Sequence, residues 1–273
     1  MIKLELQNVW LAYDGKVVVK GVTFQLLPGE IVGLIGPNGS GKSTIIKAIS
    51  CVIPTYTGKI LLDGKDIFKT PRKDLARLLG VVPQMPILPS AFTAFEIVLM
   101  GRNPHLGLLQ YEGERELAIT WQAMEMTATQ SLAERRIGEL SGGEIQRLII
   151  ARVLTQEPKA ILLDEPTANL DIRHQVEILD LIRSLCRKDN LTVLAALHDL
   201  NLAAQYCDRL ILINNGQVHA QGTPREVINS QNIMDVYGTD SCVYPHPING
   251  LPAVLPRAGN SRYASTREQE KGD

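Results

Sequence analysis

Long apolar runs are missing from this sequence. No stretch approaches the roughly 18 consecutive apolar residues that a membrane-spanning helix requires. Residues 1–7 alternate apolar and polar side chains, which is typical of a strand and excludes the apolar core of a signal peptide. We therefore expect a soluble, cytoplasmic chain. If it works at a membrane, it does so by holding on to other subunits.

Paired cysteines are missing as well. The four cysteines are scattered and form no CxxC pair: Cys51, Cys186, Cys207 and Cys242. Their spacing indicates neither a disulfide framework nor a zinc site, and with the histidines it gives no support to a metal- or redox-dependent enzyme. We expect the cysteines to be small buried apolar side chains in a reducing compartment.

An excess of charge of one sign is also absent. The 28 Lys+Arg against 29 Asp+Glu leave a net charge of −1. Proteins that bind nucleic acid through its phosphates usually carry a basic excess. A dedicated DNA- or RNA-binding protein is therefore disfavoured, and we expect no nucleic acid as a partner.

The sequence contains enough apolar residues for a folded core. Hydrophobic residues make up 45% of the 273 positions and charged residues 21%, which is ordinary globular composition and favours about one to two domains. Short apolar runs alternate with amphipathic helical stretches. Strands buried on both faces and separated by helices predict an α/β fold with a mostly parallel sheet.

The local patterns predict the following elements. Strands are expected at 3–9, 17–26, 30–35, 58–62, 81–82, 160–163, 192–197, 209–213 and 217–220, with a turn at Asp14-Gly15 between the first two. Helices are expected at 44–53, 94–101, 112–130, 143–154 and 172–187, the last with Val176, Leu179, Ile182 and Leu185 on one face. Prolines among apolar residues in 243–256 favour extended structure packed on the domain. The tail 257–273 lacks large apolar residues and is expected to be disordered.

One glycine-rich segment has the pattern of a phosphate-binding loop. Residues 36–43 fit GxxxxGK[ST] between an expected strand and an expected helix. Its candidate phosphate-binding residues are Gly36, Asn38, Gly39, Ser40, Gly41, Lys42, Ser43 and Thr44. The glycines let backbone N–H groups and the helix N-terminus face phosphates, Lys42 adds a positive charge, and the Ser43 hydroxyl reaches Mg²⁺. The alternative is a glycine-rich turn without a ligand.

Two acidic residues end an apolar strand at 160–166. Such a strand would carry Asp164 rigidly to the phosphate end of the sheet, where it would hold Mg²⁺ through water. Glu165 points elsewhere and is placed to act as the general base on an attacking water molecule. Two acids in an ordinary turn are the alternative.

A second glycine pair stands before another expected helix, in the segment 140–144. Ser141 is a natural N-cap, and Gly142 and Gly143 would let another molecule approach the backbone closely. The segment is therefore either a second anion site at a helix N-terminus or an ordinary capped helix.

These three motifs in this order resemble the ATP-binding subunit of an ABC (ATP-binding cassette) transporter, over roughly residues 2–240. The resemblance implies roles for five more residues: Tyr13 stacks on adenine, Gln84 senses Mg²⁺ and the γ-phosphate, Asp171 communicates across a dimer, His198 contacts the γ-phosphate, and Gly216 begins the terminal hairpin. Each could also be an ordinary structural residue, and Asp171 could also be a helix N-cap. The chain carries Glu144 where many members of the family have Gln.

The resemblance also implies an architecture and an assembly. We expect a P-loop cassette with a RecA-like, mostly parallel sheet, an N-terminal antiparallel β subdomain, and an α-helical subdomain inserted near 88–157. A C-terminal extension, 241–256, follows the ATPase domain. Family members form head-to-tail homodimers in which residues 141–144 of one subunit complete the ATP site of the other. ATP and Mg²⁺ are the expected ligands, with Gln84, Glu165 and His198 as catalytic residues.

The segment 85–107 is rich in apolar residues for a loop region. Met85, Ile87, Leu88, Phe92 and Phe95 lie among prolines, which favours either a docking surface or a satellite core under the loop. In the family this region receives the transmembrane permease. The resemblance thus places the chain at the cytoplasmic face of the membrane as a peripheral subunit, served indirectly by an extracytoplasmic substrate-binding protein.

Local segments suggest the transported substrate. Residues 100–107 and 198–203, Pro245-His246-Pro247 and Leu251-Pro252 are similar to importers of iron–siderophore, haem and cobalamin. Importers of zinc, manganese or molybdate are alternatives. A soluble ABC-type ATPase of iron–sulfur assembly is the alternative outside transport.

Overall fold

The computed structural model describes residues 2–13, 15–107 and 110–257. Asp14 of the expected first turn and residues 258–273 of the expected tail lie outside the described residues. The strands are β1 (Leu4–Tyr13), β2 (Lys16–Leu26), β3 (Ile31–Ile35), β4 (Thr57–Leu62), β5 (Lys65–Asp66), β6 (Leu79–Val82), β7 (Ala160–Asp164), β8 (Thr192–Ala196), β9 (Arg209–Asn214), β10 (Gln217–Gly222), β11 (Ser241–Pro245) and β12 (Pro252–Pro256). The α-helices are α1 (Lys42–Ile49), α2 (Arg72–Leu78), α3 (Ala94–Leu99), α4 (Glu114–Met126), α5 (Gly142–Leu154), α6 (Ile172–Asp189), α7 (Leu200–Tyr206), α8 (Pro224–Val227) and α9 (Ser230–Tyr237). The 3₁₀ helices are η1 (Ile67–Lys69), η2 (Met100–His105), η3 (Gln130–Leu132) and η4 (Ile137–Glu139).

Two sheets form the centre of the molecule. The six-stranded sheet has the order β10-β9-β3-β8-β7-β6 and is parallel except for β10. The four-stranded antiparallel sheet has the order β2-β1-β4-β5. Strands β3, β7 and β8 are buried at every position, as their unbroken apolar runs predict. The mostly parallel sheet and the N-terminal antiparallel sheet are therefore confirmed.

Each face of the six-stranded sheet has its own core. One face packs with α1 and the antiparallel sheet, around residues such as Leu34 and Ile45. The other face packs against α5, α6 and α7, around residues such as Ile149 and Ile182. This layering holds the strand ends rigidly, which matters because the candidate site residues follow those ends.

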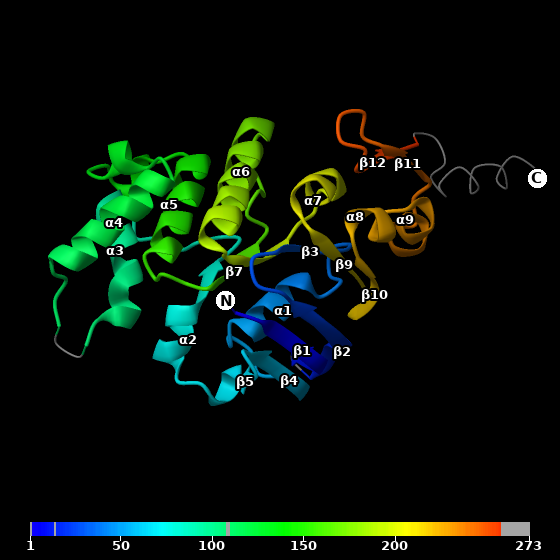
Figure 1. Cartoon of the computed structure of the whole chain (residues 1–273), viewed down its shortest axis with the longest axis horizontal. Coiled ribbons are helices and arrows are strands. Elements are labelled where there is room, and N and C mark those ends of the chain that lie inside the picture. The colour runs from blue at the N-terminus through cyan, green and yellow to red at the C-terminus, as the bar shows by residue number, and fades with distance from the viewer. Residues whose placement is uncertain (1, 14, 108–109, 258–273) are drawn as a thin grey trace, which may run out of the picture.

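A helical layer made of α3, α4 and α5 projects to one side of the sheets (Figure 1). It has a third core of its own, with Ile97, Met124 and Leu148 buried. We propose that this layer is the inserted helical subdomain expected near 88–157. Across the described part of the chain, every helix is too short or too polar to cross a membrane.

The last described residues form a hairpin at the opposite end of the molecule, near α9 (Figure 1). Strands β11 and β12 pair antiparallel, and the Asn201 side chain bonds both backbone groups of Val254, at 2.7 Å to its N–H and 3.3 Å to its carbonyl. The extended structure expected for 243–256 is thus present. Within the hairpin Cys242 is only half-buried, whereas the other three cysteines are buried as expected.

Some local expectations were wrong. Helix α1 begins at Lys42 and ends at Ile49, instead of covering 44–53. The helix expected at 94–101 ends at Leu99, where η2 takes over. On α6, Val176 is 36% exposed although its spacing predicted a buried position. The local sequence patterns did not predict helices α2, α7, α8 and α9, because their apolar patterns are short or weak.

Candidate nucleotide-binding site

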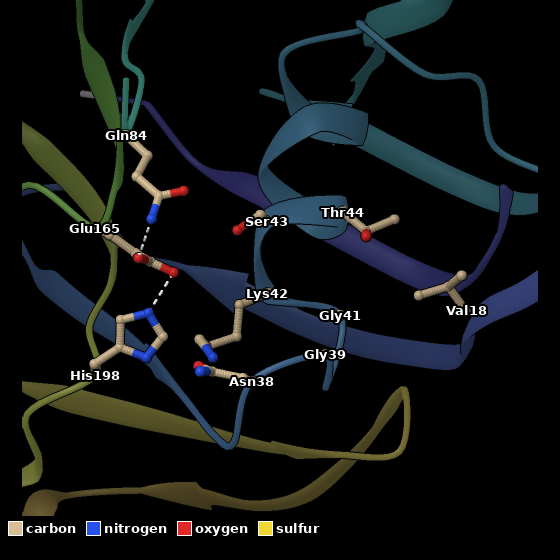
Figure 2. Close-up of a pocket in the computed structure, with 10 residues that line it drawn as sticks. All are labelled: Val18, Asn38, Gly39, Gly41, Lys42, Ser43, Thr44, Gln84, Glu165 and His198. Carbon is tan, nitrogen blue, oxygen red and sulfur yellow. Dashed lines mark hydrogen bonds and ion pairs between the residues drawn. The ribbon is translucent and has the colours of Figure 1, made fainter. Parts of the chain in front are cut away.

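The carboxyl ends of neighbouring parallel strands meet at one edge of the six-stranded sheet. There, β3 leads into the glycine-rich loop, β6 is followed by Gln84, β7 by Glu165, and β8 by His198. Ligands of open α/β sheets bind outside such strand ends. The edge holds a cavity of about 360 Å³. Its lining residues are Val18, Asn38, Gly39, Gly41, Lys42, Ser43, Thr44, Gln84, Glu165 and His198 (Figure 2).

The loop before α1 leaves the start of that helix open. Gly41 is the N-cap with φ +108°, in a region that favours glycine, and within the described part of the chain no side chain caps the first turn. The first N–H groups of a helix lack partners inside the helix and carry the positive end of its dipole. With Lys42 and Ser43 also lining the cavity, this end of the cavity fits an anionic phosphate chain.

Lys42 is buried at the bottom of the loop, with 4% of its surface exposed. Its Nζ donates to the carbonyl oxygens of Gly36, at 2.8 Å, and Pro37, at 3.0 Å. Burial lowers the pKa of this lysine, and the nearby carboxylates of Glu165 and Asp164 oppose that shift. These carboxylates therefore favour the charged ammonium that a phosphate site requires.

An oxygen pair fit for a hard cation lies beside Lys42. The Ser43 hydroxyl donates to Asp164 Oδ1 at 2.9 Å. Burial raises the pKa of Asp164, and the bond from Ser43 opposes this shift. A hydroxyl and a carboxylate are oxygen ligands of the kind that Mg²⁺ prefers, so this donor set fits the ion that the sequence predicts.

Glu165 is held by two neighbours on the adjoining strands. Gln84 Nε2 donates to Oε2 at 2.5 Å, and His198 Nε2 contacts Oε1 (Figure 2). The backbone of Glu165 has φ +53°, a strained conformation for a residue with a side chain. Only 11% of the Glu165 side chain is exposed, against 41% for His198. A fixed carboxylate that lines a cavity is suited to accept a proton from water there.

The second glycine motif lies outside this cavity. Ser141 is the N-cap of α5 and forms a capping box with Glu144, whose Oε2 accepts from the Ser141 N–H at 2.7 Å and hydroxyl at 2.8 Å. These bonds hold the pKa of Glu144 below its usual value. A Cβ on Gly143 would lie 2.8 Å from the ring of His174. That ring also bonds Asp171, the N-cap of α6, at 2.8 Å.

The structure thus divides the predicted site residues into two groups. Most of the loop residues line the cavity together with Gln84, Glu165 and His198. The predicted residues Gly36, Ser40 and Asp164 do not line it, although Gly36 and Asp164 bond the lining residues Lys42 and Ser43. Ser141, Gly142, Gly143, Glu144 and Asp171 form a second cluster at the starts of α5 and α6. Tyr13 belongs to neither group, because it is 58% exposed at the end of β1 and does not line the cavity.

Sequence reasoning missed three residues near these clusters. Val18 of β2 lines the cavity, and His174 joins Gly143 to Asp171. Half-buried Tyr237 of α9 accepts a backbone hydrogen bond from Gly36, which partly offsets the desolvation that raises the pKa of Tyr237 to about 12. A single valine or tyrosine far away in the chain gives no signal. His174, three residues after Asp171, could have been noticed as a helical neighbour.

Comparison with known proteins gives a consistent result. The ABC transporter family matches residues 19–168. The ferric enterobactin transport ATP-binding protein of Escherichia coli (strain K12) is 38% identical, over 93% of this chain and 94% of the relative. A hemin import ATP-binding protein of Gloeobacter violaceus is 40% identical, over 93% of this chain and 94% of the relative.

Solved structures agree with the sequence matches. An ABC transporter of the metal-chelate type, in an inward-facing conformation, has a TM-score of 0.82 at 27% identity, over 94% of this chain and 97% of that one. A dimeric ATP-binding cassette bound to ADP and phosphate has a TM-score of 0.71 at 29% identity, over 81% of this chain and 98% of that one. By the family match, the relatives and the shared fold, this chain belongs to the ABC transporter family, as an ATP-binding subunit with ATPase activity coupled to transport.

Proposed function

We propose that this chain powers the import of an iron–siderophore, haem or cobalamin-type substrate by hydrolysing ATP with Mg²⁺ beneath a membrane permease. The observation that carries the ATPase chemistry is the Glu165 carboxylate, held by Gln84 and His198 in the same cavity as the open start of α1. The substrate class is supported by relatives named for siderophore and haem transport. The substrate itself does not contact this subunit, so it is assigned by relationship alone.

Different residues of the site bind the phosphates, hold Mg²⁺ and accept the proton. The N–H groups at the start of α1 and the ammonium of Lys42 bind the phosphates. Ser43, Asp164 and Gln84 are the residues that would hold Mg²⁺, which would offset phosphate charge. Glu165 accepts the proton of the attacking water, while Gln84 and His198 keep its two oxygens in place.

A second copy of the chain completes the site. The capped start of α5, at Ser141 to Gly143, lies outside the cavity, so it serves a nucleotide bound elsewhere. Head-to-tail pairing would place it against the phosphates of the partner, and Asp171 would lie at the same interface. The similarity to a dimeric cassette with ADP and phosphate supports this arrangement. ATP then joins the two copies, and its hydrolysis releases them.

The permease docks on the loop that follows Gln84. Met85 is 79% exposed, Ile87 98% and Phe92 37%, so these three side chains form the docking face. Leu88 and Phe95 were expected to belong to it, but they are only partly exposed and pack against the buried cores. The face adjoins Gln84, which bonds Glu165, so docking and hydrolysis share one loop. Docking would hold the chain at the cytoplasmic face of the membrane, served indirectly by an extracytoplasmic substrate-binding protein.

Exchange of the catalytic carboxylate tests the proposed chemistry. Glu165→Gln should bind ATP as the unaltered chain does and form a stable ATP-dependent dimer. Hydrolysis should fall by about 10²-fold or more, because the amide cannot take a proton. The control is Glu112→Gln at an exposed carboxylate. Hydrolysis by Glu165→Gln at the unaltered rate would exclude Glu165 as the base.

Charged substitutions test the docking face. Ile87→Asp combined with Phe92→Asp should abolish recovery of the chain with its permease while leaving ATP binding intact. Ile248→Asp is the control, because Ile248 is 88% exposed in the C-terminal hairpin, at the far end of the molecule. Substrate is then assigned by comparing uptake of ferric siderophore, haem and cobalamin in the recovered complex. Equal permease recovery for the docking-face variant and the control would refute this surface.

A further inference from the structure

Arg102 is completely buried, with 1% of its surface exposed, in the 3₁₀ helix η2. Its Nη1 donates to the Thr155 carbonyl at 2.5 Å and to Glu157 Oε2 at 2.8 Å, and its Nη2 lies 3.9 Å from Glu116 Oε1. Within the described residues its Nε has no partner. Arginine is almost never fully buried unless it is paired, and burying its charge is costly. The cost of burying Arg102 indicates that the groups bonded by its guanidinium matter to the protein.

The guanidinium holds the C-terminal end of α5. That end has carbonyl groups without partners inside the helix and the negative end of the helix dipole, which a cation stabilises. Next to Arg102, a Cβ on Gly101 would lie 1.9 Å from Thr155 Oγ1, so η2 and α5 approach as closely as a glycine permits. His105 Nε2 lies 2.9 Å from the carbonyl of Gln156. Several contacts therefore fix this end of α5 to η2.

The other side of η2 is attached to the core of the molecule. Arg77 Nε donates to the Pro104 carbonyl at 2.8 Å, and Lys73 Nζ donates to the carbonyl of Leu106. Both cations belong to α2, which leads directly into β6 and so to Gln84. Thus η2 joins helix α5 to the part of the molecule that carries the Gln84 loop.

The length of α5 determines how far a change at its C-terminal end would carry. It has 13 residues, which make it about 20 Å long, so a tilt of about 5° at its C-terminal end would move Ser141 by about 1.7 Å. Misplacement of a catalytic geometry by about 1 Å can cost about 10²-fold in rate. A small change at Arg102 would therefore be amplified at Ser141.

We propose that Arg102 is a positioning residue: with η2 as the joint, it sets the angle of α5 so that Ser141, Gly142 and Gly143 meet the phosphates bound by a second copy. This inference rests on the proposed function, because it requires the head-to-tail ATP-dependent dimer. Arg102 acts on nucleotide only through α5, and it does not touch the Lys42 cavity.

The test compares dimerisation with nucleotide binding in a Glu165→Gln parent. Sedimentation equilibrium measures dimerisation at saturating ATP, and a fluorescent ATP analogue measures monomer affinity. Arg102→Met should weaken dimerisation about tenfold or more without changing monomer affinity. Arg102→Lys should recover part of the loss, since it keeps the charge but not the planar fork. Arg115→Met, at an exposed arginine on α4, is the matched control.

The outcomes separate a positioning role from a structural one. Weaker dimerisation of folded Arg102→Met, with partial rescue by lysine, supports the inference. Unchanged dimerisation at a lowered Tm would overturn it and leave Arg102 a stability residue. If Arg102→Met does not fold, His105→Ala decides, because it cuts only the contact to Gln156 and should weaken dimerisation about threefold. Absence of ATP-dependent dimers in the parent would overturn the proposed dimer itself, and this inference with it.

Discussion

The helices α1 and α5 both begin in glycine-containing segments, yet their N-termini differ in capping and charge. At α1 the N-cap is Gly41, no side chain caps the first turn, and that turn has no acidic residue. At α5 the N-cap is Ser141, its hydroxyl accepts from the N–H of Glu144, and the Glu144 carboxylate lies in the first turn. The first start is left open beside a lysine, and the second is capped and carries a negative charge.

This difference implies an order of events. An open helix start with a neighbouring ammonium attracts phosphate by itself. A capped start with a carboxylate attracts an anion less strongly, because the carboxylate already occupies the positive end of the dipole. In the proposed head-to-tail pair, nucleotide would therefore bind first at α1, and α5 of the second copy would add to it afterwards. Four predictions test this comparison.

The largest effect, on ATP affinity, is expected at the uncapped N-terminus of α1. Lys42→Met keeps most of the side-chain volume and removes the charge, so ATP affinity should fall by about 10²-fold or more, since a charge-assisted bond to phosphate in a buried site is lost. Isothermal titration calorimetry measures it. Lys59→Met, at an exposed lysine on β4, is the control. Unaltered affinity of Lys42→Met would remove the contrast between the two helix starts.

A smaller effect is expected at the glycines of α5. Gly143→Ala places a methyl group 2.8 Å from His174, which must displace the ring from Asp171 at a cost of about 1–3 kcal/mol. ATP-dependent dimerisation should fall about tenfold, with monomer nucleotide affinity unchanged. In Gly142→Ala the new methyl group would lie 3.9 Å from Leu170, an ordinary van der Waals contact, so chemical denaturation should show a free energy of unfolding within about 0.5 kcal/mol of the unaltered chain. Equal stability losses in both variants would contradict the contact with His174.

The carboxylate of Glu144 allows a sharper comparison. Glu144→Gln removes the negative charge from the start of α5, so ATP-dependent dimerisation should strengthen about two- to fivefold, while the free energy of unfolding falls by about 0.5–1 kcal/mol. Sedimentation equilibrium and urea denaturation measure the two effects. Weaker dimerisation would show that the carboxylate does not oppose the incoming phosphate.

The smallest effect is a pH dependence. Hydrogen bonds from Ser141 lower the pKa of folded Glu144, so its contribution to stability is full above the unfolded pKa and is lost as pH falls through the folded pKa. The stability difference between the unaltered chain and Glu144→Gln should be constant above about pH 5 and shrink by about 0.5 kcal/mol below it. Urea denaturation between pH 3 and pH 7 measures it. A difference that grows on acidification would contradict the lowered pKa.

Much of the fold follows from local patterns. The unbroken apolar runs of β3, β7 and β8 indicate strands buried on both faces, and Gly36, Asp164 and His198 mark where these runs end. The helices α2, α7, α8 and α9 could not be predicted in the same way, because they are short and owe their stability to packing on the sheet. Val176 shows the converse case: the period of α6 predicts a buried face, but the position remains 36% exposed.

The chemical groups and their order can be identified without a structure: the phosphate loop, the acidic pair, the second glycine motif and the residues after the strands. Which of these groups meet depends on how the chain packs. The tertiary structure brings Gln84, Glu165 and His198 together because parallel strands end at one edge, and it leaves Ser141 and Asp171 outside that cavity. It also buries Arg102 against partners from other parts of the chain, Glu116, Thr155 and Glu157. Contacts of this kind depend on which surfaces pack together. Burial raises the free-energy cost of leaving a charged residue unpaired.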